Sequence, residues 1–569
     1  MMGKAKKWLG LTVFFILIVT ALFSPLASND VIPPYEMVFY VGYVVQAKLG
    51  LDDGQIPLRT SPIQWHGYDY PIYQFTSPLP YTIGGLIYKY FTPSNPYEAT
   101  KYTMMLALIF GGIFMYKTAD LLTKSSQASL IASVIYLMSP YIISFLTHVG
   151  AFTEACSWGM VPIAVYGSLK CYYNPIWRRV AYMGISWFLL ATTHNITFFF
   201  TFVFSAIFIS LLSLYDLYCK RNRQCIIDFL KISCGFALGI ALSLFFLGPL
   251  AVYGGMTNAG YYHPNPMQHT HLTNIYSLLS PAYALPEPVD RELHPNPYKI
   301  SISVGWPMLL LSGLVAYHLF FDPKVFSGDE KKNSIFLFLV FIISFFVVWS
   351  PFDFWKYLPN AFMVVQWSFR VFPQILWSGT LLSAIAIKKL VKKENKLVML
   401  VGVLIVGVSA GLFFTPLEGD FFRISLQELV SRKGSMEHMH PQPDYLFGSV
   451  YWKAIYPGVY VNNELPVEDC KKRGTIKECS IEVTRQRIVQ LPILYSPEML
   501  SIEVNGEKLN YFPVVTEKPY MLAGINLPPG KYFVTAEFTG LWWANWISLI
   551  AWVLLAAYIS LEHLKNAQL

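Results

Sequence analysis

Charge is scarce in this chain. Only 13% of its 569 residues are Asp, Glu, Lys or Arg, whereas 54% are hydrophobic and 17% are aromatic. Soluble globular proteins carry roughly 25% charged residues, so the composition excludes a soluble enzyme and indicates a polytopic membrane protein. A basic stripe interleaved with aromatic residues is also lacking, so the formal net charge of +8 does not indicate a nucleic-acid partner.

Internal repeats and metal-binding cysteine patterns are lacking as well. Many transporters are built from internal repeats, so the lack of a clear repeat speaks against that class. Cysteine is sparse, with seven residues in the chain. Cys470 and Cys479 form a Cys-x8-Cys pair with no matching His or Cys pair, which disfavours zinc and predicts a disulfide in an oxidising compartment.

Long hydrophobic runs are what the chain has in abundance. Trp8 to Ala27 contains no charge and is long enough, at 1.5 Å per residue, to cross a hydrocarbon core of about 30 Å. We predict about twelve membrane-spanning helices in all. They cover residues 8–28, 100–121, 128–147, 156–172, 180–194, 196–215, 229–252, 302–321, 334–350, 367–388, 397–415 and 542–561.

The basic residues are distributed unevenly between the segments that join these helices. Half of the 42 Lys and Arg residues fall at the N-terminus, at the C-terminus and in alternate short loops, whereas the long segments 29–99 and 253–301 hold very few. Under the positive-inside rule, both termini are cytoplasmic and the two long segments are outer loops. The predicted location is the cytoplasmic (inner) membrane.

The first outer segment, Asn29 to Tyr81, is where polar residues are concentrated. Asp30 follows directly after the first helix, at the membrane–water boundary where a lipid-tethered substrate places its head group. We therefore predict a catalytic carboxylate there; the alternative is that Asp30 caps the next helix. The substrate-binding candidates of the segment are Glu36, Asp69, Tyr70 and Tyr81, although most aromatic rings here would also suit an interfacial belt.

Four ionisable residues lie at the predicted outer ends of later helices. Glu154 and Arg370 enter apolar runs, where a charged group usually faces a cavity or a partner. Glu154 is a catalytic candidate, with stabilisation of its own helix start as the alternative. Arg370 is a candidate phosphate ligand because guanidinium binds phosphate through two parallel hydrogen bonds, with a structural Arg–carboxylate pair as the alternative. His148 and His194 are substrate-binding candidates, although His194 also suits a simple turn.

Two histidines of the second outer loop complete the candidate set. His269 and His271 are spaced so that they could ligate a metal with a third residue, but the pair alone is a weak signal, and a structural role or substrate hydrogen bonding is preferred. The cofactor is left open; a divalent cation, Mg²⁺ or Mn²⁺, held by Asp30 and Glu154 is one option.

The chain changes character after residue 415. We predict three parts: a transmembrane domain over 1–415, an extracytoplasmic β-rich domain over 416–541 and a final helix with a cytoplasmic tail over 542–569. Asn505-Gly506 predicts a hairpin, Pro528-Pro529-Gly530 predicts another, and the whole resembles a small β-sandwich. The predicted strands are 480–487, 488–495, 500–504, 507–515, 520–526 and 531–538.

An ordered set of short motifs carries a family resemblance. The motifs are Gly67–Tyr81, Gly150–Glu154, Thr193–Asn195, Leu358–Pro359 and Gln366–Arg370. In this order, followed by a β-rich domain and a last helix, they resemble bacterial multi-spanning proteins labelled 6-pyruvoyl-tetrahydropterin-synthase-related and their YfhO-like relatives. These in turn resemble the GT-C glycosyltransferases. The label implies no pterin chemistry.

The resemblance implies a GT-C-like fold and an enzyme that takes a sugar from a polyprenyl-phosphate carrier at the outer membrane face. It implies that Asp30 is the first-loop carboxylate, and that Glu154 and Arg370 match the acidic and Phe-x-x-Arg-like positions. The partners would be the lipid-linked donor, a glycolipid or surface-glycan acceptor, and the bilayer. Two other classes stay open: a lipid or polysaccharide transporter of the flippase type, and a non-catalytic assembly protein that binds a partner through its β domain.

Overall fold

The structure is a computed structural model that describes most of the chain in two compact units. It describes residues 2–27, 37–257, 273, 275–283, 301–352, 354–359, 362, 365, 367–391, 396–414, 467, 469–515 and 521–567. Unit 1 comprises Met1–Val38, Lys101–Ile240 and Asn265–Ile424, and unit 2 comprises Phe39–Thr100, Ala241–Pro264 and Ser425–Leu569. Asp30, Glu36, His269 and His271 lie outside the described residues.

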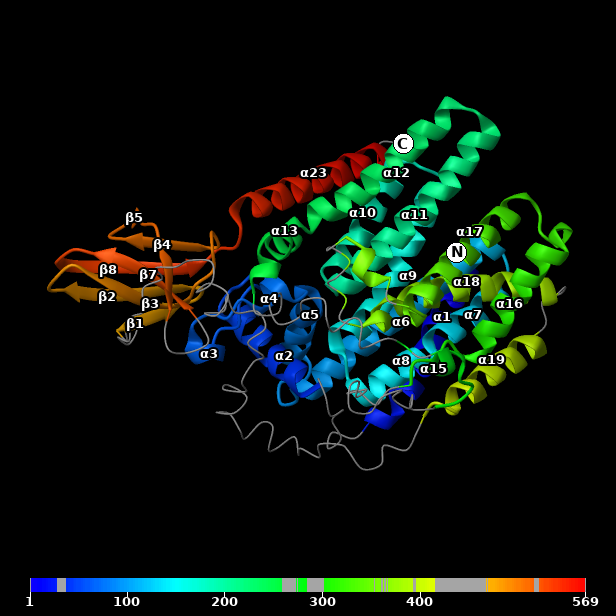
Figure 1. The fold of residues 1–569 in the computed structure, drawn as a ribbon, viewed down its shortest axis with the longest axis horizontal. Coiled ribbons are helices and arrows are strands. Elements are labelled where there is room, and N and C mark those ends of the chain that lie inside the picture. The colour runs from blue at the N-terminus through cyan, green and yellow to red at the C-terminus, as the bar shows by residue number, and fades with distance from the viewer. Residues whose placement is uncertain are drawn as a thin grey trace. The chain divides into compact units, whose positions relative to one another are not determined.

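Unit 1 is a bundle of helices (Figure 1). Its longer helices are α1 (Met2–Leu22), α6 (Pro96–Thr123, whose first turn belongs to unit 2), α7 (Ser126–Leu137), α9 (Phe152–Tyr173), α10 (Trp177–Ala191), α11 (Asn195–Lys220), α12 (Arg223–Leu242), α16 (Trp306–Phe321), α17 (Gly328–Trp349), α18 (Phe372–Leu390) and α19 (Lys396–Gly411). Its short helical turns are η1 (Ser24–Leu26), α8 (Pro140–Ser144), η2 (Phe145–Val149), α15 (Ile275–Leu279), η5 (Pro323–Val325), η6 (Trp355–Tyr357) and η8 (Ser368–Val371).

The long apolar helices confirm the prediction of an integral membrane protein. In lipid, a spanning segment must satisfy its backbone hydrogen bonds internally, which favours continuous helices. Eight helices of the described chain are long and apolar enough to cross a membrane. The spans Ser126–Val149 and Ser368–Leu390 are each 94% buried inside the protein, so α7 and α18 lie at the centre of the bundle.

The remaining predicted spans also form helices, but they are less suited to crossing alone. Helix α10 has 15 residues, and α16 and α19 have 16 each. Helix α9 has 22 residues and carries Glu154 in its first turn. The predicted span 229–252 is represented among the eight by α12, which ends at Leu242; the chain breaks at Ser243 and α13 (Leu244–Tyr253) follows.

Unit 2 combines helices with two antiparallel sheets. Its helices are α2 (Met37–Asp52, beginning in unit 1), α3 (Gln64–Gly67), α4 (Ile72–Phe75), α5 (Pro78–Tyr90), α13, η3 (Gly254–Met256) and α23 (Trp542–Ala567). Its strands are β1 (Cys470–Arg473), β2 (Ile476–Val483), β3 (Arg487–Leu494), β4 (Leu500–Val504), β5 (Glu507–Lys508), β6 (Phe512–Val515), β7 (Met521–Leu527) and β8 (Gly530–Phe538). One sheet has the order β1-β2-β8-β4-β5 and the other β3-β7-β6.

The sheets confirm the predicted small β domain, with corrections of detail. Buried side chains from both sheets, among them Leu491 and Val534, form one hydrophobic core. Asn505 and Gly506 have φ angles of 53° and 86° and join the paired strands β4 and β5, as a two-residue hairpin requires. The second predicted hairpin is wrong: β7 and β8 belong to different sheets, so residues 528 and 529 cross between the sheets. The predicted strand 507–515 is divided into β5 and β6.

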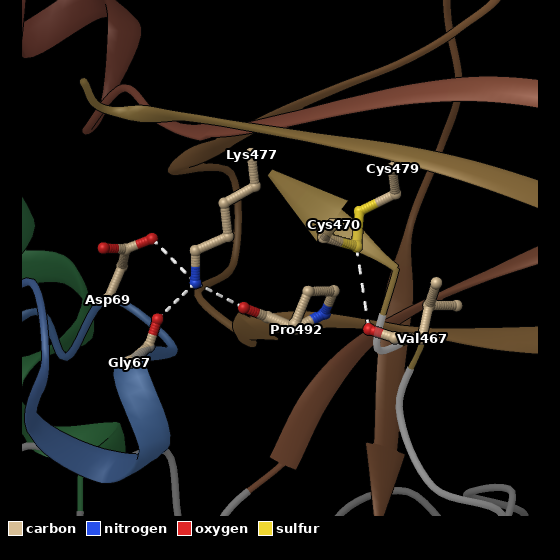
Figure 2. Close-up of a disulfide and its surroundings, with 7 residues drawn as sticks. All are labelled: Gly67, Asp69, Val467, Cys470, Lys477, Cys479 and Pro492. Atoms are coloured by element: carbon tan, nitrogen blue, oxygen red, sulfur yellow. Dashed lines mark hydrogen bonds and ion pairs between the residues drawn. A yellow bond between two sulfur atoms is a disulfide. The ribbon is translucent and has the colours of Figure 1, made fainter. Parts of the chain in front are cut away.

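The predicted disulfide is confirmed. Cys470 and Cys479 are joined across the antiparallel pair β1–β2, with their Cα atoms 4.1 Å apart (Figure 2). The bond closes the β1–β2 hairpin. A cross-link of this kind stabilises the fold mainly by restricting the unfolded chain.

Candidate functional site

Three long helices of unit 1 begin close together. The hydroxyl of Ser157, near the start of α9, donates to Thr197 Oγ1 in the first turn of α11 at 3.1 Å. The ring of Tyr141 in α8 stacks on Phe372, the first residue of α18, with ring centroids 4.4 Å apart. Each helix start carries unpaired backbone N–H groups and the positive end of the helix dipole. The convergence therefore creates a region that favours negative charge.

Glu154 is the carboxylate of this region. It lies in the first turn of α9 and is 6% exposed. The hydroxyl of Tyr141 donates to Glu154 Oε1 at 2.7 Å, and Tyr141 itself is fully buried. A buried carboxylate without hydrogen bonds costs several kcal/mol. Its position at a helix start and the tyrosine hydroxyl both offset that cost.

The entry to α9 explains why Glu154 points inward. The chain passes from α8 into a single π-helical turn, η2, and leaves it at Gly150, whose φ is 69°. Glycine adopts this left-handed conformation without a steric penalty. The reversal allows α9 to begin at Phe152 and brings Glu154 back towards Tyr141, thirteen residues earlier in the chain. π-helical turns are frequent at functional sites.

His194 holds the start of α11. It precedes Asn195 as the cap residue, and its Nδ1 accepts from the backbone N–H of Thr197 at 3.2 Å and lies 2.8 Å from the Thr197 hydroxyl. The imidazole thus does the work that Ser or Asp performs at most helix starts. In the structure, His194 therefore has a structural role in the turn before α11. A role in binding substrate stays a prediction.

Arg370 lies in η8, the turn that leads into α18. The carbonyl of the preceding residue, Phe369, accepts from the Tyr141 hydroxyl at 3.4 Å, and the charge of Arg370 interacts electrostatically with Tyr141 and His194. Ser368 fixes the same turn, because its hydroxyl donates to the carbonyl of Val348 in α17 at 2.8 Å. The guanidinium, the buried carboxylate and the imidazole are thereby gathered at three neighbouring helix starts. We call Tyr141, Glu154, His194 and Arg370 the polar cluster.

His148 lies in η2, six residues before Glu154. Its Nδ1 is 2.8 Å from the Thr147 hydroxyl and 3.2 Å from the Ser144 carbonyl, and its ring stacks on Tyr283 with centroids 5.1 Å apart. The imidazole is half-buried. The stacked pair of His148 and Tyr283 therefore lies next to the π-helical turn that leads into α9. A role in binding substrate stays a prediction.

The polar cluster combines groups of complementary chemistry. A carboxylate can accept a proton or orient a hydroxyl, and a guanidinium can bind a phosphate and stabilise its negative charge. Ionisable groups in membrane helices are expensive and usually functional. The described parts of the chain contain no group of three or more His, Cys, Asp or Glu side chains that could hold a metal ion. Mg²⁺ is usually bound through one or two carboxylates together with waters and substrate phosphates, and Glu154 is the carboxylate that the described cluster offers.

Three candidates of the first outer segment, Asp69, Tyr70 and Tyr81, are described, and all three lie in unit 2. Asp69 is 4% exposed, and its carboxylate lies 3.0 Å from Lys477 Nζ of β2 (Figure 2). Lys477 also donates to the Gly67 and Pro492 carbonyls. Tyr70 and Tyr81 are buried, with Tyr81 packed against Tyr43 and Tyr73. As placed, these side chains serve ion pairing and packing, and their substrate role stays a prediction.

Tyr141 of the polar cluster and several polar residues near it were not predicted from the sequence. Tyr141, Ser157 and Thr197 were not singled out, because a lone hydroxyl in an apolar run gives no periodic signal. Gln374 was also missed: it donates to Thr201 at 2.9 Å and accepts from Trp377 at 2.8 Å inside the central helix α18. An amide in such a buried helix needs partners, and that requirement is the signal that could have identified it.

Comparison with known proteins gives likenesses of fold only. No protein-family model and no curated protein matches the chain, so the narrower family names suggested by the motifs stay predictions. The chain is similar to ArnT from Cupriavidus metallidurans, solved bound to undecaprenyl phosphate, with 12% identity, 76% of this chain and 79% of that chain covered, and a TM-score of 0.42. It is also similar to the Archaeoglobus fulgidus oligosaccharyltransferase in its apo form, with 12% identity, 76% and 56% covered, and a TM-score of 0.37. With TM-scores below 0.5, neither likeness carries a functional conclusion.

Proposed function

We propose that this integral membrane protein is an inverting glycosyltransferase. It would move a sugar from a polyprenyl-phosphate carrier to a lipid-linked or surface-glycan acceptor on the outer face of the cytoplasmic membrane. The observation that carries the proposal is the polar cluster, in which a buried carboxylate and a guanidinium lie at three converging helix starts. A lipid phosphate needs such a positive region within reach of the bilayer.

The chemistry is a single displacement at the anomeric carbon. The acceptor oxygen forms a bond to that carbon while the bond from the carbon to the phosphate oxygen breaks, and the leaving polyprenyl phosphate keeps the electron pair. The acceptor hydroxyl gives its proton to a carboxylate, for which Asp30 is the proposed base. One displacement inverts the configuration.

The cluster residues have distinct proposed roles. Arg370 binds the phosphate and stabilises the charge that develops as it leaves. Glu154, held by the Tyr141 hydroxyl at 2.7 Å, orients the acceptor hydroxyl. His148 and His194 contact the substrates at the edge of the cluster. No step is assigned to a metal; a cation at this site would need ligands beyond Glu154, with Asp30 as the proposed one.

The proposed topology agrees with the disulfide. Structural disulfides form in oxidising compartments, and the Cys470–Cys479 bond lies in the β domain. The proposal therefore places the β domain outside the cytoplasm and, by the positive-inside rule, both termini inside.

The test is sugar transfer by the full chain in liposomes. Radiolabelled polyprenyl-phosphate sugars and a membrane glycolipid extract are supplied, and label in the acceptor fraction is followed for wild type and Asp30→Asn. Transfer by wild type that falls at least a hundredfold in a folded Asp30→Asn variant supports the enzyme and its base. Equal transfer by both removes Asp30 as the base. No transfer with any carrier contradicts the proposed function.

A further inference from the structure

Arg59 of unit 2 is held by two other elements of that unit. Its Nη1 donates to Gln74 Oε1 of α4 at 2.7 Å, and its Nη2 donates to Asn545 Oδ1 of α23 at 2.8 Å. Its Cζ lies 5.9 Å from the ring centroid of Phe245 in α13. Gln74 is itself fixed, because its amide donates to the Phe245 carbonyl at 3.0 Å. The orientation of the guanidinium is therefore set by anchored neighbours.

All of these partners are neutral. No carboxylate in the described part of the chain forms an ion pair with Arg59, and two amide oxygens use only two of its five N–H groups. Burial lowers the pKa of the Arg59 guanidinium to about 10, so the group stays protonated at neutral pH. A desolvated cation without a counter-charge is costly. The arrangement thus lacks one negative charge.

The backbone makes room for the guanidinium. Gly540 has a φ of +71°, and a Cβ atom built on it would lie 2.2 Å from Arg59 Nη1 and 3.2 Å from Gln74 Oε1. Only glycine leaves this space open. Because Gly540 comes two residues before α23, the site lies at the start of that helix, whose positive dipole end adds to the charge of Arg59.

The position along α23 indicates the kind of anion. Trp542–Leu564 is apolar and long enough to cross a membrane, and Asn545 lies in its first turn. Trp542 and Trp546 are exposed at this end, and tryptophan is enriched at the level of the lipid head groups. We infer that Arg59, oriented by Gln74 and Asn545, binds the phosphate of an anionic lipid of the bilayer.

The site is partly exposed, as such binding requires. Arg59 is half-buried as a residue, and its two amide-bound nitrogens are fixed. A guanidinium that is already held in one orientation loses less conformational entropy on binding a phosphate than a freely rotating one does. The inference concerns unit 2 alone and does not depend on the proposed glycosyl transfer.

The experiment compares the full chain in vesicles of phosphatidylcholine with an equimolar mixture of phosphatidylcholine and phosphatidylglycerol. Bound phosphatidylglycerol is counted by native mass spectrometry, and its affinity is titrated in neutral detergent. The decisive variant is Asn545→Asp, which puts a carboxylate where Oδ1 now lies 2.8 Å from Nη2. An acid in the first turn of a helix is favourable, so this variant should fold.

We expect wild type to retain one bound phosphatidylglycerol. Asn545→Asp should bind this lipid about tenfold or more weakly, because its new carboxylate forms an ion pair with the Arg59 guanidinium in place of the lipid phosphate. Arg59→Lys, which keeps the charge and loses the fork, should also bind it more weakly. The matched control is Arg473→Gln, an exposed arginine of β1 in the same unit, which should bind as wild type does.

Equal binding by wild type, Asn545→Asp and Arg59→Lys overturns the inference. Weakening by Arg473→Gln to the same extent also overturns it, because binding would then follow net charge. Inorganic phosphate, titrated separately, distinguishes the sources: competition by phosphatidylglycerol alone supports a lipid ligand, whereas binding of inorganic phosphate without phosphatidylglycerol overturns it.

Discussion

Replacement of Lys477 by methionine should loosen the contact between the β domain and the first outer segment within unit 2. The Lys477 side chain is 6% exposed and lies 3.0 Å from the Asp69 carboxylate, itself 4% exposed. Removing one partner of a buried ion pair costs about 3–5 kcal/mol, because the other charge stays buried. Lys472 remains 3.6 Å from Asp69, so we expect the lower end, about 3 kcal/mol.

The segment that Lys477 holds has an unusual backbone. Trp65, His66 and Asp69 all have positive φ, at 51°, 61° and 57°. Each such residue costs of order 1–3 kcal/mol and persists only where its surroundings hold it. The Gly67 carbonyl accepts from Lys477, so loss of the ammonium group should release this turn.

Hydrogen exchange of the Leu494 amide reports the release. This N–H donates to the Tyr68 carbonyl at 2.9 Å, across the same contact. A loss of about 3 kcal/mol corresponds to more than a hundredfold faster exchange, since about 1.4 kcal/mol is tenfold. The control is Lys471→Met, an exposed lysine of the same hairpin.

A double variant separates pairing from packing. Lys477→Met combined with Asp69→Leu removes both charges, and an apolar pair of similar size is often neutral. We expect most of the lost protection to return. Exchange in Lys477→Met that matches the Lys471→Met control, or a double variant as loose as the sum of its two single variants, would refute the reasoning.

Three further outcomes are expected. Tyr141→Phe removes the hydroxyl that donates to Glu154, and a hydrogen bond to a charged group contributes about 1.5–3 kcal/mol. Sugar transfer should therefore fall roughly ten- to a hundredfold. The control is Tyr136→Phe, which loses only a hydrogen bond to the Trp158 carbonyl and should not cause this loss. Replacing both Cys470 and Cys479 with serine should lower the free energy of unfolding of the β domain by about 2–3 kcal/mol in denaturant titration, and an unchanged midpoint would speak against the cross-link. Burial raises the pKa of Asp52, but hydrogen bonds from Lys48 and Lys89 outweigh it and hold the pKa below 3.8. The carboxylate therefore stabilises the folded state above that pH and ceases to do so as the pH falls through its lower folded pKa. Hydrogen exchange of α2 and α5 should accordingly speed up less on acidification in Asp52→Asn than in wild type.

The sequence was most informative where one physical requirement dominates. Apolar runs predicted the helices because a lipid environment leaves few alternatives. Asn505-Gly506 predicted its hairpin because both residues tolerate positive φ. Pro528-Pro529-Gly530 misled, because turn residues mark a change of direction without saying whether the next strand joins the same sheet.

Contacts between distant segments were beyond the sequence. Glu154 stood out as a carboxylate in an apolar run, but its partner Tyr141 is an ordinary aromatic residue of a membrane protein. Asp69 was predicted as a substrate-binding residue, whereas its ion-pair partner, Lys477, lies more than four hundred residues later in the chain. Arg59 gave no signal at all, because its anchor Asn545 belongs to the last helix of the chain.

The measurement that tests the central claim most directly is sugar transfer by Glu154→Gln in liposomes, with binding of polyprenyl phosphate measured on the same preparation. Glutamine keeps the size of the side chain and can still accept from Tyr141, so the fold should be retained. The account predicts transfer at least a hundredfold below wild type, with carrier binding retained through Arg370. Transfer at the wild-type rate would contradict the assignment of the polar cluster as the site of glycosyl transfer.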